Sequence, residues 1–171
     1  SSIVLDLYNN EVLYENNAYS KMLPASLTKV LTAYVAYKYY DLNDFIVITY
    51  DMINVEGSRI YLEVGDVISV KDLIYGLLLC SGNDAALALA YKYSGELNDF
   101  IILMNETSKK IGMKNSTYSK KDFEFEDIAA QYRYNNKTKE FENCGTDNCF
   151  RLGELYESGG AGCISTVDDY I

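Results

Sequence analysis

The residues of this chain best suited to chemistry are a serine and a lysine separated by two positions, Ser26 and Lys29. Apolar residues recur at helical spacing through residues 24–35, so the two side chains are expected one turn apart on one face of a helix. A buried lysine can remove the serine proton, and unpaired N–H groups at the start of a helix can stabilise an oxyanion. Alone, the pattern is common by chance, and such pairs usually lie on a solvated face.

The composition limits which other catalytic groups are available. The chain has 171 residues, a net charge of −10 and no histidine. Ser-His-Asp and Cys-His arrangements are therefore excluded, as is a histidine-ligated zinc site. A base that works near neutral pH must be a lysine, aspartate, glutamate or tyrosine with a shifted pKa. A nucleic-acid partner is not expected, because no basic stripe is present to neutralise phosphates.

A second candidate pair, Ser81 and Asn83, follows an apolar segment and precedes a predicted helix. On such a connection Ser81 could relay a proton, and Asn83 could form a hydrogen bond with a substrate amide. The competing interpretation is an ordinary turn between two helices with an asparagine or aspartate as cap. The tripeptide alone favours that ordinary turn.

The elements that must position these side chains follow from periodicity and from turn residues. We expect strands over residues 3–7, 11–15, 45–48 and 67–70, and helices from Pro24 to about residue 40 and over residues 70–79, 84–93 and 97–111. The first two strands should form a hairpin, Ser69 should cap the second helix, and Gly112 should end the last. Near the end of the chain, Ser165 or Thr166 should cap a further helical turn.

The four cysteines include one pair that could form a disulfide. Cys144 and Cys149 bracket a predicted turn and could close a small loop in an oxidising compartment. Free thiols are equally compatible with the sequence. No pair has the Cys-x-x-Cys spacing of a zinc site.

Taken together, the two motifs and their flanking residues resemble a known family. Ser-x-x-Lys followed by Ser-x-Asn is typical of penicillin-binding proteins and serine β-lactamases. The segments PASLTK (24–29) and LLLCSGNDAA (77–86) closely resemble D-alanyl-D-alanine carboxypeptidases, as do IVLD (3–6) before VLYE (12–15), and MN (104–105) before IGMKNST (111–117). The resemblance covers residues 2–118 in the same order along the chain.

This resemblance implies an α+β fold of the serine β-lactamase/transpeptidase-like class, in a single domain over residues 1–171 that is incomplete at its C-terminus. An α/β sandwich lobe and a mainly helical lobe would enclose the active site. Ser26 would be acylated by a peptidoglycan stem peptide that ends in D-Ala-D-Ala, with Lys29 as its base. Ser81 would pass a proton to the leaving D-Ala, and Asn83 would hold the substrate backbone. β-Lactam antibiotics would acylate the same serine, and no metal or organic cofactor would be needed.

The family's third motif, Lys-Thr-Gly or a close variant, does not occur in these residues. Lys137-Thr138-Lys139 lacks the glycine, and in Glu157-Ser158-Gly159 the glutamate would repel the substrate carboxylate that this motif binds. Segments 128–134 and 156–170 look more like the class C β-lactamase and esterase branch, in which Ser-Thr-x-x-Asp precedes the third motif. We therefore expect a chain that stops before the remaining central strands.

Several functional interpretations stay open. A D-Ala-D-Ala carboxypeptidase is the first, and a serine β-lactamase or esterase of the same superfamily is the second. The third is a non-catalytic module that binds peptidoglycan or penicillin, or an inert remnant, which the missing third motif favours. Because peptidoglycan lies outside the cytoplasmic membrane, an exported protein whose signal peptide was removed is expected. The sequence contains no apolar run long enough to span a bilayer and does not indicate whether the protein is anchored to a membrane.

Overall fold

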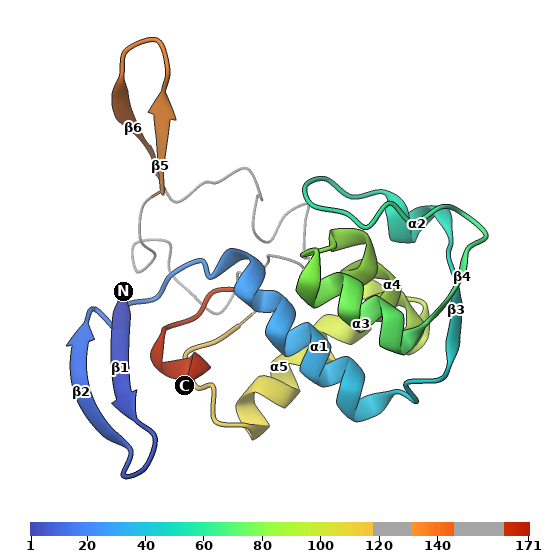
Figure 1. The fold of residues 1–171 in the computed structure, drawn as a ribbon, viewed down its shortest axis with the longest axis horizontal. Coiled ribbons are helices and arrows are strands. Elements are labelled where there is room, and N and C mark those ends of the chain that lie inside the picture. The colour runs from blue at the N-terminus through green and yellow to red at the C-terminus, as the bar shows by residue number, and fades with distance from the viewer. Residues whose placement is uncertain (118–130, 146–162) are drawn as a thin grey trace.

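Helices form the body of the molecule in the computed structural model, which describes residues 1–117, 131–145 and 163–171. The helices are α1 (Thr28–Tyr39), α2 (Tyr50–Ile53), α3 (Val70–Leu79), α4 (Asn83–Ser94) and α5 (Leu97–Lys110). Helix α4 contacts the other four (Figure 1). Every residue from Asp84 to Ala90 is buried, which is typical of a helix at the centre of a bundle.

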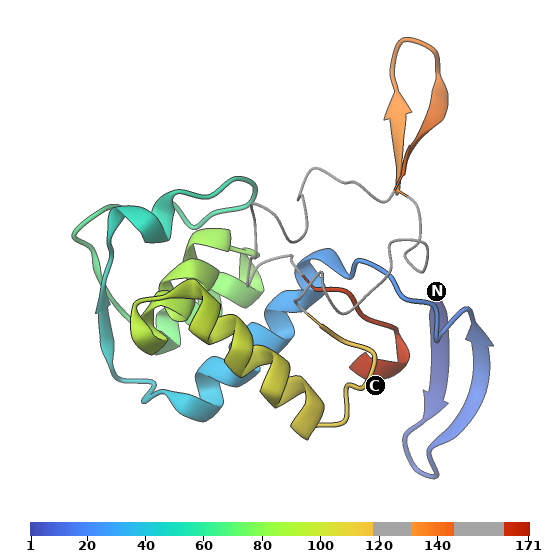
Figure 2. The same cartoon turned by 180° about the vertical axis from the view of Figure 1, so that it is seen from behind.

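The described strands form three separate antiparallel hairpins. They pair β1 (Ser2–Asp6) with β2 (Glu11–Asn16), β3 (Phe45–Val47) with β4 (Val67–Ser69), and β5 (Gln131–Asn135) with β6 (Glu140–Gly145). The β1–β2 and β5–β6 hairpins stand apart from the helices (Figures 1 and 2). The β3–β4 hairpin lies at the end of the helical body that is far from β1–β2. The α+β class is confirmed. In the described ranges, however, the expected α/β sandwich lobe is represented only by hairpins that share no sheet.

Two hydrophobic clusters hold the helices together, and α1 contributes to both. One cluster contains Leu73 and Leu77 of α3 and Leu89 of α4, and the other contains Phe100 and Met104 of α5. Helix α1 therefore packs against both α3 and α5. This packing determines where the side chains near its N-terminus can lie.

The apolar spacing expected for this first helix describes its burial only in part. Leu31 and Val35 are buried, whereas Leu27, Val30 and Tyr34 are 56%, 52% and 40% exposed. The buried face of α1 instead carries small residues, namely Thr28, Thr32, Ala33 and Ala36. Small side chains suit this face because two neighbouring helices approach it closely. The apolar spacing therefore predicted the helix, but Leu27, Val30 and Tyr34 do not belong to its buried face.

Most element boundaries agree with the sequence-based expectations. The Ser69 hydroxyl accepts the N–H of Asp72 at 3.0 Å and caps α3, as predicted. Gly112 follows the end of α5 with a φ of +94°. Helix α1 starts at Thr28, later than predicted, because a short 3-10 helix precedes it. Helix α2 and the β5–β6 hairpin were not predicted. No described helix is long and apolar enough to cross a lipid bilayer.

The last described segment, residues 163–171, packs against the N-terminal part of the chain. Ser165 pairs with Met22 through two backbone hydrogen bonds of 2.9 and 2.7 Å. The Asp169 carboxylate accepts the Ser116 hydroxyl at 2.6 Å. Thr166 Oγ1 accepts the N–H of Asp169 at 3.3 Å, but Val167, rather than the predicted Ser165 or Thr166, stands at the N-cap of the final 3-10 helix (Asp168–Tyr170).

Candidate active site

Ser26 lies in the 3-10 helix η1 (Ala25–Leu27), immediately before α1. Pro24 precedes this helix, and its carbonyl accepts the N–H of Leu27 at 3.1 Å. Ala25 has a φ of +48°, in the left-handed region that costs a residue with a Cβ about 1 kcal/mol or more. Backbone strain of this kind concentrates at functional sites. The sharp entry into α1 leaves the Ser26 side chain exposed to solvent.

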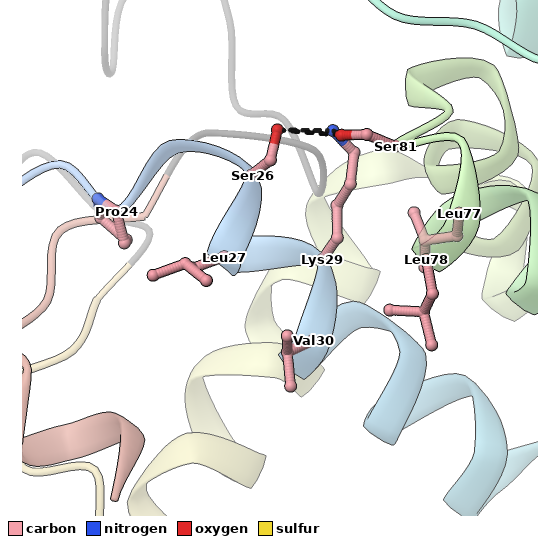
Figure 3. A pocket seen from close by; sticks show the side chains of 8 residues that line it. All are labelled: Pro24, Ser26, Leu27, Lys29, Val30, Leu77, Leu78 and Ser81. Atoms are coloured by element: carbon pink, nitrogen blue, oxygen red, sulfur yellow. Dashed lines mark hydrogen bonds between the residues drawn. The ribbon is translucent and has the colours of Figure 1, made fainter.

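Three polar side chains meet at this point, as Figure 3 shows. Lys29 Nζ donates to Ser26 Oγ at 3.1 Å and to Ser81 Oγ at 3.0 Å. Ser81 Oγ donates in turn to Ser26 Oγ at 3.1 Å. The side chains of Ser26 and Lys29 thus meet, although Ser26 lies in η1 and not, as predicted, in the same α-helix as Lys29. The fold adds Ser81 from 52 residues beyond Lys29 to complete a triangle of hydrogen bonds.

The environment of Lys29 favours its neutral form. The residue is 3% exposed, although it carries an amine at the end of a long side chain. Burial lowers its pKa below the usual value of a lysine, because water that would solvate the ammonium group is excluded. In the described ranges its hydrogen-bond partners are two hydroxyls rather than a carboxylate, and no ion pair with it is found. A lysine of this kind can serve as a general base.

Ser81 belongs to the short connection between α3 and α4. Its φ of +54° is left-handed, so the second corner of the triangle also lies on strained backbone. Gly82 follows, and a Cβ there would lie 3.0 Å from Ile60 Cγ2. The connection is therefore packed closely against the segment that contains Ile60. The Ser81 hydroxyl, on the residue before Gly82, accepts the Lys29 amine.

Asn83, the fourth predicted site residue, is placed differently from the other three. Its side-chain Nδ2 donates to the Glu56 carbonyl at 2.7 Å, and its backbone N–H donates to the Ser58 carbonyl at 2.8 Å. Its Oδ1 is buried and has no hydrogen-bond partner among the described residues. Asn83 therefore holds the segment at residues 56–58 and keeps one unused acceptor. A role in binding substrate remains a prediction.

A cavity of about 370 Å³ opens beside the triangle, between the start of α1 and the end of α3. It is lined by Pro24, Ser26, Leu27, Lys29, Val30, Leu77, Leu78 and Ser81. The three polar groups thus face a space with mainly apolar walls, within the size range of small-molecule sites. Asn83 is not among the lining residues.

Neither of the two segments considered for the third motif is found at this site among the described residues. Lys137-Thr138-Lys139 forms the turn of the β5–β6 hairpin, where Lys137 N–H donates to Asn135 Oδ1 at 2.8 Å. That hairpin points away from the helices (Figure 1). Glu157-Ser158-Gly159 lies outside the described residues, and so does Cys149 of the possible disulfide. Within the described ranges, no three acidic or cysteine side chains gather as they would around a metal ion.

A serine that follows a strained alanine and is hydrogen-bonded to a buried lysine and to a second serine defines a candidate acyl-serine site. Residues 1–123 match the family described as D-alanyl-D-alanine carboxypeptidase. The chain belongs to this family. The sequence-based resemblance is therefore confirmed for this part of the chain, while the likeness of the later segments to class C β-lactamases stays a prediction.

Individual relatives agree with this assignment. The chain is 40% identical over 129 residues to D-alanyl-D-alanine carboxypeptidase DacC of Escherichia coli, a match that covers 68% of this chain and 32% of that protein. It is 31% identical over 123 residues to DacF of Bacillus subtilis, covering 69% of this chain and 32% of that protein. The chain thus spans about a third of the length of these relatives.

A solved structure extends the comparison to the fold. The D-alanyl-D-alanine carboxypeptidase of Mycobacterium tuberculosis H37Rv superposes with a TM-score of 0.69 at 26% sequence identity. The match covers 98% of this chain and 51% of that chain. The transpeptidase-like α+β class predicted from the sequence is thereby confirmed.

Proposed function

We propose that this chain carries the acylation centre of a serine-type D-Ala-D-Ala carboxypeptidase, with peptidoglycan stem peptides as its substrates. The observation that supports this most directly is the triangle of Ser26, Lys29 and Ser81, with all three sides close to 3 Å. Family membership indicates the kind of carbonyl that the serine attacks.

In the proposed reaction, the neutral amine of Lys29 accepts the proton of Ser26 Oγ as that oxygen attacks the penultimate D-Ala carbonyl. The tetrahedral intermediate collapses by breaking the bond to the terminal D-Ala nitrogen. The Ser81 hydroxyl, bonded to both other groups, passes the proton from Lys29 to that nitrogen, and D-Ala leaves. Water then attacks the ester and returns its proton to Ser26 Oγ, which restores the free enzyme.

Asn83 is proposed to bind the substrate backbone. Its Oδ1 is buried without a partner in the described structure, and such an acceptor is costly to leave unpaired. A peptide N–H of the substrate would satisfy it. A β-lactam would acylate Ser26 in the same way, but ring opening releases no leaving group from the site, so the acyl-enzyme accumulates.

A location outside the cytoplasmic membrane belongs to this proposal, because the substrate lies there. The main alternative is a non-catalytic module that binds peptidoglycan or penicillin. It is favoured by the absence of a Lys-Thr-Gly triplet from the sequence. A β-lactamase or esterase of the same superfamily would differ in the rate at which water removes the acyl group.

The proposal is tested by incubating the chain with a fluorescent penicillin and measuring the mass of the intact protein. One covalent penicillin is expected on the wild-type chain and none on Ser26→Ala. Ser20→Ala is the matched control, because Ser20 is exposed and makes no side-chain hydrogen bond in the described structure. No adduct on the wild-type chain would refute the acylation centre. An adduct that disappears within seconds would favour a β-lactamase, and a persistent one favours the carboxypeptidase.

A further inference from the structure

The acidic residue that follows the second motif is buried and wholly engaged with backbone. Asp84 is 1% exposed and lies in the first turn of α4. Its carboxylate accepts the N–H of Ile60 at 3.0 and 3.1 Å and the N–H of Leu62 at 3.1 Å. Ala85 N–H is a further donor at 3.0 Å. In the described ranges no lysine or arginine pairs with Asp84. A buried carboxylate without a cation depends on such N–H donors.

The two donors from residues 60 and 62 converge because the residue between them is strained. Tyr61 has a φ of +61°, in the left-handed region. Successive N–H groups that flank such a residue form a concave site for an anion. The Asp84 carboxylate occupies this site. The strained backbone at Tyr61 and the buried charge at Asp84 therefore stabilise each other.

The same segment, residues 56–62, also holds the residue next to Asp84. The Glu56 carbonyl accepts the Asn83 side-chain amide and the Ser58 carbonyl accepts the Asn83 backbone N–H. Gly57 lies so close that a Cβ on it would be 2.9 Å from Asn83 Nδ2. Asn83 and Asp84 thus bind opposite ends of the segment, which we call the clamp loop (residues 56–62).

The middle of the clamp loop packs on the glycines that surround Ser81. A Cβ on Gly76 of α3 would lie 2.7 Å from Ile60 Cδ1, and one on Gly82 would lie 3.0 Å from Ile60 Cγ2. Ile60 is also the residue whose N–H is bound twice by Asp84. A displacement of Ile60 would therefore reach the strained backbone at Ser81.

We propose that Asp84 is a positioning residue for the acylation site. By binding the N–H groups of Ile60 and Leu62, it holds the clamp loop against the α3–α4 connection, and this sets the positions of Ser81 and Asn83. The inference rests on the proposed function where it concerns the reaction. The structural part of the inference does not depend on the proposed function. It states that Asp84 orders the clamp loop and that the ordered loop holds Asn83. The competing role is simple stabilisation of α4 by a negative charge at its N-terminus.

Asp84→Asn tests the inference, and Asp72→Asn is its matched control. Asp72 lies in the first turn of α3 and is exposed, so it shares the helix-terminal charge but does not bind the clamp loop. Acylation by fluorescent penicillin is expected to slow roughly 100-fold in Asp84→Asn, because the groups around Ser26 are displaced by a fraction of an ångström or more. Asp72→Asn should acylate at the wild-type rate. Equal acylation rates in both variants would overturn the role in the reaction.

Amide exchange followed by NMR tests the structural part without any activity. In the wild-type chain the N–H groups of Ile60 and Leu62 should exchange far more slowly than those of Arg59 and Tyr61, which make no hydrogen bond in the described structure. In Asp84→Asn this protection should be lost, together with that of the Asn83 side-chain amide, while Asp72→Asn keeps both.

The two experiments fail in different ways. A wild-type chain that takes no penicillin would refute the proposed function, and the exchange measurement would still decide the role of Asp84. Unprotected Ile60 and Leu62 amides in the wild-type chain would overturn the inference even if Asp84→Asn did not fold. Protection of the Asn83 side-chain amide that survives in Asp84→Asn would overturn it as well, because the loop would then be held by other contacts.

Discussion

Lys29 is the residue in which burial and chemistry are most closely linked. In the described structure the buried Lys29 amine is hydrogen-bonded to two hydroxyls and to no carboxylate, and burial disfavours its charged form. That cost lowers the stability of the folded chain, and it also makes Lys29 able to accept a proton from Ser26. The same physical effect therefore weakens the fold and prepares the base.

The lowered pKa of Lys29 predicts how stability depends on pH. In the unfolded chain this lysine has its ordinary pKa, so between the two values the unfolded state binds more protons than the folded state. The free energy of unfolding contributed by Lys29 should therefore rise with pH across that interval. Urea unfolding at a series of alkaline pH values measures this. Lys29→Met should flatten the rise, and Lys38→Met, on the exposed end of the same helix, should not.

Acylation rates of the same variants distinguish the role of Lys29 as a general base from its effect on stability. Lys29→Met should lower the penicillin acylation rate by about 10²–10⁴-fold, the usual contribution of general base catalysis. In the wild-type chain the rate should increase with pH as Lys29 loses its proton. Acylation of Lys29→Met at the wild-type rate would contradict the assignment of Lys29 as base.

At the scale of elements, local signals specified α3 well. Ser69 stands directly before an apolar segment and Asp72 lies three residues later, and the structure shows the cap that this spacing predicts. Helix α3 ends at Leu79, and Ser81 lies two residues beyond it in the connection to α4.

Removal of that cap should cost stability without changing the chemistry directly. Ser69→Ala loses the hydrogen bond to the Asp72 N–H and should lower the free energy of unfolding by about 1 kcal/mol. Chemical denaturation measures the change, and Ser20→Ala again provides the control, with no loss expected. A loss as small as that of the control would mean that the Asp72 N–H finds water as an equally good partner.

Other elements were missed because their signals are weak or depend on tertiary contacts. Helix α2 (Tyr50–Ile53) spans a single turn, too short for helical periodicity to be recognised. In β5, Tyr132 and Tyr134 alternate with polar residues, but this pattern lies in a segment dominated by charge. Such a short alternation predicts a strand only weakly.

At the scale of the whole molecule, stability is distributed unevenly. Helix α4 is buried from Asp84 to Ala90, whereas all six residues of β2 are exposed. A two-stranded hairpin with little burial is only marginally stable in water. The β1–β2 hairpin is therefore held mainly by its own pairing, while the helical body is held by two cores.

Native-state hydrogen exchange should report this difference. Amides of β1 and β2 are expected to exchange with a free energy of opening close to zero, and those of α4 with a value near that of global unfolding. The comparison within one sample serves as its own control. Equal protection of Val12 and Leu89 would show that the hairpin is covered or paired in a way that the described contacts do not contain.

The sequence alone determined the family, the four longer helices and the residues of the candidate site. Ser26 and Lys29 are near neighbours along the chain, so local helical geometry suffices to bring them together. Ser81 was identified through its motif, and its distance to Lys29 came from the packing of α1 on α3.

Only the tertiary structure decided what surrounds those residues. The burial that lowers the pKa of Lys29, the exposure of Leu27 and Val30, and the contact between Asp84 and the clamp loop all depend on side chains from distant parts of the chain. No local pattern indicates that an aspartate beside a motif will bind two N–H groups more than twenty residues earlier in the chain. Such contacts arise when helices and loops pack together, because burial and hydrogen bonding are properties of the assembled core.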